Sequence, residues 1–384
     1  MVKKLNELLN SIKPQMYDDF KSIVNINSFS SNMDGIEEAL SKLVEIGKKL
    51  DIPLERVYSS KKTRPHLMYR QDKDYYAFVG HFDTVHSPLS DFQTMEDTGD
   101  LLKGPGTNDM KAGLIVALYS FYILKQLSPA VKLPIMIFFN SDEELGSPDS
   151  QEIIENQLKG ALGAFIFEPG RPNGEIVTQR KGIASLDIEI IGKPAHSGVE
   201  PWEGINSILA SCEIIDKLEK LNDYKSGIIV GCNEINGGVA RNVVPAYTKI
   251  TVDVRFLTMK QQKKLFEDIE KILNSKTKVG ASVRYDLNLN RPPLEKSKES
   301  DRLAKIYMDI AHSLDIKCEE IATGGGSDGN FLSAMGVPVL DGLGAVGNFS
   351  HTKKEFIYKE SLIYRTKIFV LFMSQLLKER DNKL

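Results

Sequence analysis

Three apolar segments of the sequence run directly into residues that bind metals or carry protons. YYAFVG is followed by His81 and Asp83, IMIFFN by Glu143 and Glu144, and GAFIF by Glu168. Imidazole and carboxylate groups without a nearby thiolate suit a catalytic zinc ion, or less specifically cobalt or manganese. A carboxylate two residues after a histidine can orient the imidazole without itself touching the metal. The pattern predicts a metal site with an open coordination position.

Two further candidates lie in loops that contain glycine. They are Asp109 in GPGTNDMKAG and His351 in GNFSHTKKEF. Each acid alone is more often a turn or helix cap, so the joint pattern carries the prediction. Two histidines and three carboxylates exceed the needs of one tetrahedral ion and suit two ions that share one carboxylate. GPGTNDMKAG lacks the Gly-Lys-Ser/Thr ending of a phosphate-binding loop, which leaves a phosphate-binding enzyme as a remote alternative.

Other candidate residues have weaker signals. The backbone N–H groups of Gly325 and Ser327, in GGGSDGN, could bind an anion, although a plain tight turn is the alternative. His196 in GKPAHSG has no motif partner nearby, and its spacing alone favours a surface or core role. His66 and His312 show no motif, and we expect structural roles for them.

Ligands of open parallel sheets bind outside the carboxyl ends of the strands, so the elements around the candidates matter. Apolar strands are predicted at 75–80, 133–140 and 163–168, and helices at 35–50 and 112–127. Apolar strands separated by helices indicate an α/β fold with a mostly parallel sheet that helices cover on both faces.

After Lys181 the pattern becomes that of a half-solvated antiparallel sheet. The predicted order is β-α-β-β-α-β, with strands at 185–192, 227–231, 248–256 and 281–290 and helices at 205–221 and 261–273. From about residue 291 the first pattern returns. We therefore expect an α/β catalytic domain made of 1–180 and 291–384, with an α+β ferredoxin-like domain inserted at 181–290.

The composition excludes some classes of function. A net charge of −3 over 384 residues, without a dense basic run, gives no reason to expect nucleic acid. Three widely spaced cysteines without a CxxC motif suggest buried, reduced thiols and a cytoplasmic location. The first 20 residues read as an amphipathic helix and not as a signal peptide. No apolar run approaches the roughly 18 residues that span a membrane, so no membrane association is expected.

The motifs resemble those of one enzyme family in order and spacing. Between about residues 75 and 357 the chain contains GHFDTV, GPGTNDMKAG, SDEELGS, FEPG, GKPAHSG, RNVVP, VDVRF, GGGSDGN and SHTKKEF. It resembles the dinuclear zinc amidohydrolases and exopeptidases, which include glutamate carboxypeptidase, acetylornithine deacetylase and succinyl-diaminopimelate desuccinylase. VTQRKG, RNVVP and GGGSDGN look closest to the glutamate carboxypeptidase branch. The resemblance implies that the inserted domain serves as a lid and forms a homodimer.

The resemblance also implies which residues would hold two Zn²⁺ per subunit, with Co²⁺ or Mn²⁺ as alternatives. Asp109 would bridge the two ions and be followed by a cis peptide bond to Met110. The remaining ligands would be His81 and Glu168 for one ion, and Glu144 and His351 for the other.

Further roles follow from the same resemblance. Glu143 would act as general base and then general acid, and Asp83 would orient its neighbouring imidazole. His196 would stabilise the oxyanion, often in the site of the partner subunit. Asn242 and Arg255 match positions that hold a substrate carboxylate, a task that suits a guanidinium fork.

The implied reaction is hydrolysis of the amide bond of an N-acyl amino acid or a short peptide with a free α-carboxylate, as in a carboxypeptidase. A biosynthetic deacylase acting on an N-acyl diamino acid is the alternative within the enzymes, and a non-catalytic metal- or peptide-binding protein is the alternative outside them. One departure from the family pattern is the His86-Ser87-Pro88 segment, which displaces a proline by one position. We expect His86 at the rim of the cleft, where it would affect substrate selectivity.

Overall fold

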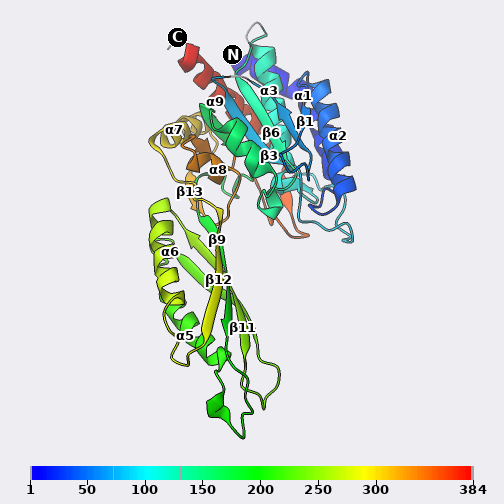
Figure 1. Ribbon diagram of the computed structural model, residues 1–384. Coiled ribbons are helices and arrows are strands. Elements are labelled where there is room, and N and C mark those ends of the chain that lie inside the picture. Colours follow the sequence, from blue (N-terminus) through cyan, green and yellow to red (C-terminus); the bar gives the residue numbers. More distant parts are fainter. Residues whose placement is uncertain (1, 72, 130–131, 382–384) are drawn as a thin grey trace. The chain divides into compact units, whose positions relative to one another are not determined.

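The computed structural model describes residues 2–71, 73–129 and 132–381 (Figure 1). The chain divides into two compact units. The first unit comprises Met1–Thr178, Lys296–Ala322 and Ser327–Leu384, and the second comprises Gln179–Glu295 and Thr323–Gly326. The second unit thus extends a few residues beyond 181–290 at both ends and includes a short segment that the sequence pattern did not indicate. Residue 1 and residues 382–384, which we assigned to the catalytic domain, lie outside the described residues.

The first unit contains a six-stranded, mostly parallel sheet. Its order is β1 (Glu55–Val57), β2 (His66–Tyr69), β6 (Ile135–Asn140), β3 (Tyr76–His81), β7 (Gly163–Ile166) and β14 (Val339–Leu340). The pairs β3–β6, β3–β7 and β7–β14 are parallel, whereas β1 and β2 form an antiparallel edge. Every residue of β3 and β6 is buried, which explains why these strands read as continuous apolar runs.

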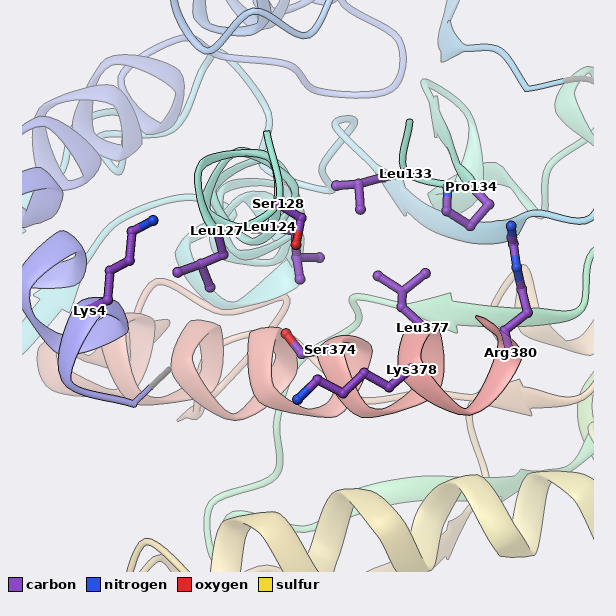
Figure 2. Close-up of a pocket in the computed structure, with 10 residues that line it drawn as sticks. All are labelled: Lys4, Leu124, Leu127, Ser128, Leu133, Pro134, Ser374, Leu377, Lys378 and Arg380. Atoms are coloured by element: carbon purple, nitrogen blue, oxygen red, sulfur yellow. The ribbon is translucent and has the colours of Figure 1, made fainter. Parts of the chain in front are cut away.

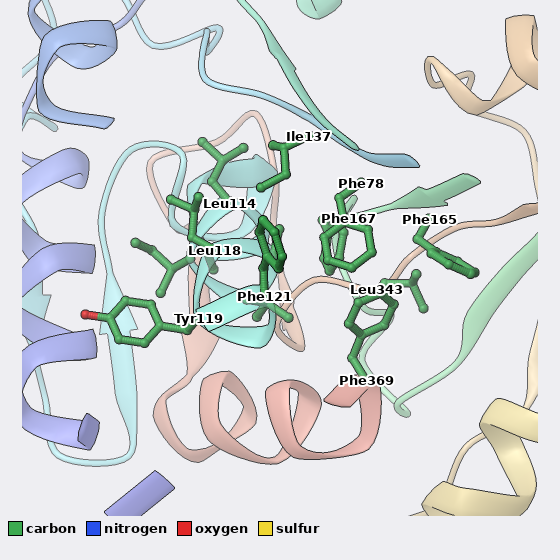
Figure 3. Packing of buried hydrophobic residues seen from close by; sticks show 14 of the residues in the cluster. Phe78, Leu114, Leu118, Tyr119, Phe121, Ile137, Phe165, Phe167, Leu343 and Phe369 are labelled. Atoms are coloured by element: carbon green, nitrogen blue, oxygen red, sulfur yellow. The ribbon is translucent and has the colours of Figure 1, made fainter. Parts of the chain in front are cut away.

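Helices supply the other half of this core. They are α1 (Val2–Val24), α2 (Met33–Lys49), α3 (Ala112–Leu127), α7 (Lys298–His312) and α9 (Lys359–Asp381), and all contribute to one buried apolar cluster. Figure 3 shows side chains of the strands, of α3 and of α9 packed together. The Phe369 ring meets Phe78 at 5.1 Å and Phe167 at 4.9 Å between centroids, both edge to face. The predicted α/β fold class is confirmed.

Helix α3 corrects one expectation. The segment Thr107–Leu127 is long and apolar enough to cross a membrane by length and composition, although no such run was expected. In the structure, 78% of its apolar window is buried inside the protein. A helix that is apolar on every side is the expected form for a helix covered all round by other elements. We interpret α3 as a core helix.

Several short elements were not predicted. A second four-stranded sheet has the order β15 (Gly347–Asn348), β16 (Phe356–Tyr358), β5 (Leu101–Lys103) and β4 (Glu96–Asp97). Further short elements include β8 (Ile176–Arg180), which pairs with β13 (Glu320–Thr323), and the helices α4 (Ser150–Ile153) and α8 (Gly329–Ala334). Strands of two or three residues are too short to show a periodicity in the sequence.

The second unit is a four-stranded antiparallel sheet with two helices. The sheet order is β10 (Ile229–Gly237), β11 (Tyr247–Phe256), β9 (Gly182–Ile191) and β12 (Ser282–Arg291), and the helices are α5 (Ser207–Glu219) and α6 (Met259–Leu273). Both helices run along the same face of the sheet (Figure 1). Alternate residues of β9 are buried, so the predicted half-solvated pattern is confirmed. Topology and order are those of the predicted ferredoxin-like arrangement.

The three cysteines are all free, as expected, but only Cys318 is buried. Cys212 is exposed and Cys232 is half-buried, so the expectation of buried thiols was wrong for these two. Cys212 lies on helix α5 of the second unit and Cys232 on strand β10.

Candidate metal centre

The candidate residues gather where three neighbouring parallel strands end. His81 is the last residue of β3 and pairs in register with Asn140, the last residue of β6. Glu143 and Glu144 follow β6 within four residues, and Glu168 follows the end of β7 by two. Because parallel strands point their carboxyl ends to the same edge of a sheet, the side chains converge there.

The His81 imidazole lies between three carboxylates. Its Nε2 is 3.3 Å from Asp109 Oδ1 and 3.6 Å from Glu168 Oε1. On the other side of the ring, Nδ1 is 3.0 Å from the backbone carbonyl of Asp83 and 3.3 Å from Asp83 Oδ1. Asp83 therefore orients the ring so that Nε2 faces the other acids.

Asp109 faces two histidines with its two oxygens. Oδ1 points to His81, and Oδ2 lies 3.4 Å from Nε2 of His351. The same His351 nitrogen is 3.2 Å from Glu144 Oε2. The peptide bond between Asp109 and Met110 is cis, as the resemblance implied. One carboxylate thus joins two groups of donors.

The spacing of these atoms fits metal ions better than hydrogen bonds. Among the described residues, His81 Nε2 and Glu144 Oε1 are buried without a hydrogen-bond partner. Two ligands of a tetrahedral zinc ion, each about 2.1 Å from it, are about 3.4 Å apart. The separations of 3.2 to 3.6 Å between imidazole nitrogen and carboxylate oxygen match that value. Ligand atoms of His81, Asp109 and Glu144 lie within 4.8 Å of one another.

The crowded carboxylates shift the protonation of the site. The pKa of His351 is raised to about 11 by the neighbouring carboxylates of Asp109 and Glu144. Burial alone would lower the pKa of His81, but Asp109, Asp83 and Glu168 outweigh it and raise that pKa well above its ordinary value. Burial raises the pKa of Glu144 to about 7. The site therefore holds an excess of negative charge that cations stabilise.

Asp83 has a second task at the turn after β6. Its Oδ1 accepts a hydrogen bond from Glu143 N–H and its Oδ2 from Glu144 N–H, both at 3.2 Å, while Ser30 Oγ donates at 2.8 Å. Asp142, before the two glutamates, accepts from backbone N–H groups at the start of α4. The turn is thus fixed from both sides. Ligand atoms of Glu143, His81 and Glu168 lie within 4.8 Å of one another, so Glu143 faces the centre of the group.

Comparison with known proteins decides the family. Residues 77–375, more than three quarters of the chain, match the model of peptidase family M20/M25/M40. The chain belongs to the M20 peptidase family. It is an enzyme of the metallopeptidase and amidohydrolase type, and the predicted resemblance is confirmed.

Two M20 relatives differ in their reactions. Carboxypeptidase G2 from Pseudomonas sp. (strain RS-16) is 27% identical over 282 residues, which cover 72% of this chain and 67% of the relative. Acetylornithine deacetylase from Myxococcus xanthus is 29% identical over 192 residues, which cover 47% of this chain and 49% of the relative. Both a carboxypeptidase and a deacylase are therefore among the relatives.

Solved M20-like structures share the fold. A tripeptidase from Staphylococcus aureus has a TM-score of 0.78 and 20% identity, and covers 94% of this chain and 97% of that one. A dinuclear metal-binding M20 peptidase from Bacillus subtilis has a TM-score of 0.69 and 16% identity, with 96% and 99% covered.

His86 is placed differently from the expectation for this M20 chain. Its side chain is only 8% exposed, and Nε2 lies 2.6 Å from Oε2 of the fully buried Glu355. The prediction of a rim position was wrong. The sequence does not reveal that the His86 imidazole pairs with a buried carboxylate, that of Glu355. Glu355 itself was missed, although it lies in the quoted SHTKKEF motif.

The GGGSDGN loop offers less to an anion than expected. Ser327 is fully buried, its N–H donates to Asn330 Oδ1 at 3.0 Å, and its hydroxyl donates to Asp341 Oδ2 at 2.6 Å. Both groups are therefore engaged within the protein, which argues against Ser327 as a substrate contact. The carbonyl of Gly325 accepts from Arg180 at 3.3 Å.

Three predicted residues belong to the second unit. His196 is exposed, and its segment pairs with the Asn242 segment, where Ser197 N–H donates to the Asn242 carbonyl at 3.0 Å. Arg255 lies near the opposite end of β11, with Nε 2.8 Å from Asp253 Oδ2 and Nη1 3.4 Å from the Gly324 carbonyl. Tyr247 is the first residue of β11, and Asn242 precedes it. At about 3.4 Å per residue, Tyr247 and Arg255 are already about 27 Å apart along the strand.

The two other histidines have structural partners, as expected. His66 is buried and lies 3.1 Å from Asp149 Oδ1, and His312 Nε2 lies 2.9 Å from the Cys318 carbonyl.

A cavity of about 320 Å³ lies elsewhere in the first unit (Figure 2). Leu133 and Pro134, which precede β6, line it together with Leu124, Leu377 and basic side chains such as Lys378. It adjoins the beginning of β6, whereas the candidate ligands follow the end of that strand. None of the predicted site residues lines it.

Proposed function

We propose that this M20 enzyme cleaves the amide bond of an N-acyl amino acid or short peptide that has a free α-carboxylate. The observation that carries the proposal is Asp109 between two imidazoles, with Glu143 facing the same group of donors. The name of the relative carboxypeptidase G2 supports this substrate class.

Two zinc ions are the proposed cofactors, with cobalt or manganese as alternatives. Asp109 would bridge them, and His81, Glu168, Glu144 and His351 would complete the donor set. When bound, the ions would lower the pKa of a water to about 7 and polarise the substrate carbonyl.

The side chains of the site would then move the proton. Asp83 fixes the 143–144 turn, so Glu143 is held in place to accept the proton of the attacking water. The same carboxyl group would deliver this proton to the leaving amine. His196 would donate to the developing oxyanion, and Arg255 would bind the α-carboxylate through its planar fork.

The layout of the second unit supports a homodimer in which subunits share sites. His196 and Asn242 lie beyond one end of β11, and Arg255 lies near the other. Side chains so far apart on one rigid sheet cannot contact one small substrate, so two subunits would supply them. We propose that His196 and Asn242 serve the site of the partner subunit.

Three free cysteines agree with a reducing compartment such as the cytoplasm.

Acetylornithine deacetylase among the relatives keeps a biosynthetic deacylase as the second candidate. A hydrolysis screen separates the two, using an N-acyl glutamate, N-acetylornithine, N-succinyl-diaminopimelate and dipeptides. The control is each preferred substrate with its α-carboxylate converted to an amide, and metal content is measured on the same sample.

We expect the N-acyl glutamate to be cleaved, its amidated form to be resistant and a chelator to abolish activity. A preference for N-acetylornithine would favour the deacylase. Bound metal without any hydrolysis would point to a binding protein and contradict the proposal.

A further inference from the structure

The Glu355 carboxylate is completely buried and accepts hydrogen bonds from the backbone of the loop that carries Asp109. Oε1 accepts from the N–H groups of Asn108 at 2.8 Å and Asp109 at 2.9 Å. Oε2 accepts from Gly106 N–H at 3.2 Å and lies 2.6 Å from His86 Nε2. A buried carboxylate is stable only with such donors, and charge-assisted bonds of this kind are among the strongest in proteins.

His86 is held in a single orientation. Its ring packs edge to face on Phe92, with centroids 5.3 Å apart, and its backbone carbonyl accepts from Asn27 Nδ2 at 3.1 Å. The Phe92 ring and the Glu355 carboxylate therefore hold the imidazole, and Asn27 holds the backbone that carries it. The ring therefore supplies the side-chain donor that completes the set of four around the carboxylate.

The turn that carries Glu355 also carries His351. Thr352 N–H donates to the Phe349 carbonyl at 3.1 Å, and Glu355 N–H to the Thr352 carbonyl at 3.2 Å. A second link joins the two loops, since Asn108 Nδ2 donates to Ser350 Oγ at 2.8 Å. The turn from Phe349 to Glu355 and the loop from Gly106 to Asp109 are thus bound together next to the candidate centre.

We propose that His86 and Glu355 are positioning residues that set the separation of Asp109 and His351. They thereby set the affinity for the ion that these two residues and Glu144 would hold, which rests on the proposed function. The other ion depends less on them, because His81 and Glu168 are placed by β3 and β7.

Three variants test this role: His86→Phe, which removes the donor, His86→Gln, which keeps an N–H donor, and Glu355→Gln, which removes the charge. The metal-free full-length chain is titrated with Co²⁺, both affinities are measured by calorimetry, and the visible spectrum is recorded. We expect His86→Phe and Glu355→Gln to weaken one ion about tenfold or more, with an altered cobalt spectrum. His86→Gln should bind nearly as the unchanged protein does.

Tyr119→Phe is the matched control, because it removes a hydrogen bond of 2.7 Å to the buried acid Asp19. It should lower thermal stability and leave both cobalt affinities unchanged. Equal weakening in this control, or unchanged affinities and spectra in His86→Phe and Glu355→Gln, would overturn the proposal.

Hydrogen exchange of the metal-free chain keeps this result separate from the proposed function. The peptide spanning residues 104–111 should exchange faster in His86→Phe and Glu355→Gln than in Tyr119→Phe. If the unchanged chain bound no pair of ions, the dinuclear proposal would fail, yet exchange would still reveal whether the pair orders the loop. Equal exchange of this peptide in all variants would contradict the positioning role of His86 and Glu355.

Discussion

At the scale of single residues, the site is defined by negative charge around two imidazoles. Asp109 lies 3.3 Å from one imidazole and 3.4 Å from the other, and Glu144 and Glu168 flank the same nitrogens. Without metal, protons on the imidazoles offset this charge. Metal ions and protons must therefore compete for the same nitrogens.

Metal binding should accordingly depend on pH. The neighbouring carboxylates raise the pKa of His81 and raise that of His351 to about 11, so they favour the protonated form of both rings in the metal-free protein. Because only the neutral ring binds metal, binding releases these protons, and affinity falls as the pH is lowered. Calorimetric titration with Zn²⁺ in buffers of different ionisation enthalpy measures the release. An affinity that does not change between about pH 6 and about pH 8 would contradict this charge balance.

The sequence allowed the candidate ligands to be predicted because each one follows a recognisable apolar strand or lies in a motif. His86 and Glu355 show where such prediction ends. Their pairing spans 269 positions along the chain and depends on the fold of two loops, which no local pattern encodes. His86 was therefore expected to be exposed, although it is buried against Glu355.

At the scale of elements, the contact between α3 and the segment after β7 is unusually close. A Cβ at Gly113 would lie 1.9 Å from the Phe167 carbonyl oxygen. Phe167 directly precedes Glu168, so the glycine lets the helix approach the backbone that positions a candidate ligand. Only glycine permits this approach without a backbone shift.

Gly113→Ala should therefore destabilise the protein and weaken metal binding. Alanine favours a helix by about 1 kcal/mol over glycine, but overpacking against backbone costs about 1–3 kcal/mol. We expect chemical unfolding to give a lower free energy of unfolding for Gly113→Ala, and metal titration to give a lower affinity. Gly160→Ala is the control, because its Cβ would meet no atom within 4 Å. A Gly113→Ala protein as stable and as metal-competent as this control would contradict the close contact.

Long elements were predictable from their periodicity, whereas the small ones were not. The runs that became β3, β6 and α3 are buried throughout or nearly so, which forces apolar residues at nearly every position. The strands of the sheet of β4, β5, β15 and β16 have only two or three residues, and its central pair, β5 and β16, joins segments more than 250 positions apart. Strands this short show no periodicity, and the β5–β16 pairing depends on a partner far along the chain.

At the scale of the whole molecule, the proposed homodimer would share its active sites between the two subunits. A mixture of His196→Ala and Glu143→Ala chains tests this, since each variant alone should be nearly inactive. After subunit exchange, half of the dimers are mixed and each contains one intact site, so about a quarter of the activity should return. Mixing without exchange is the control. No recovery in the exchanged mixture would show that each chain supplies its own His196.

The proposed role of Glu143 in moving the proton is tested by measuring the activity of Glu143→Gln together with the metal content of the same sample. Glutamine preserves the size of the side chain but cannot accept the proton. We predict that two ions remain bound and that kcat for the preferred substrate falls about 10²–10⁴-fold. Unchanged kcat in a fully metal-loaded Glu143→Gln protein would contradict the account.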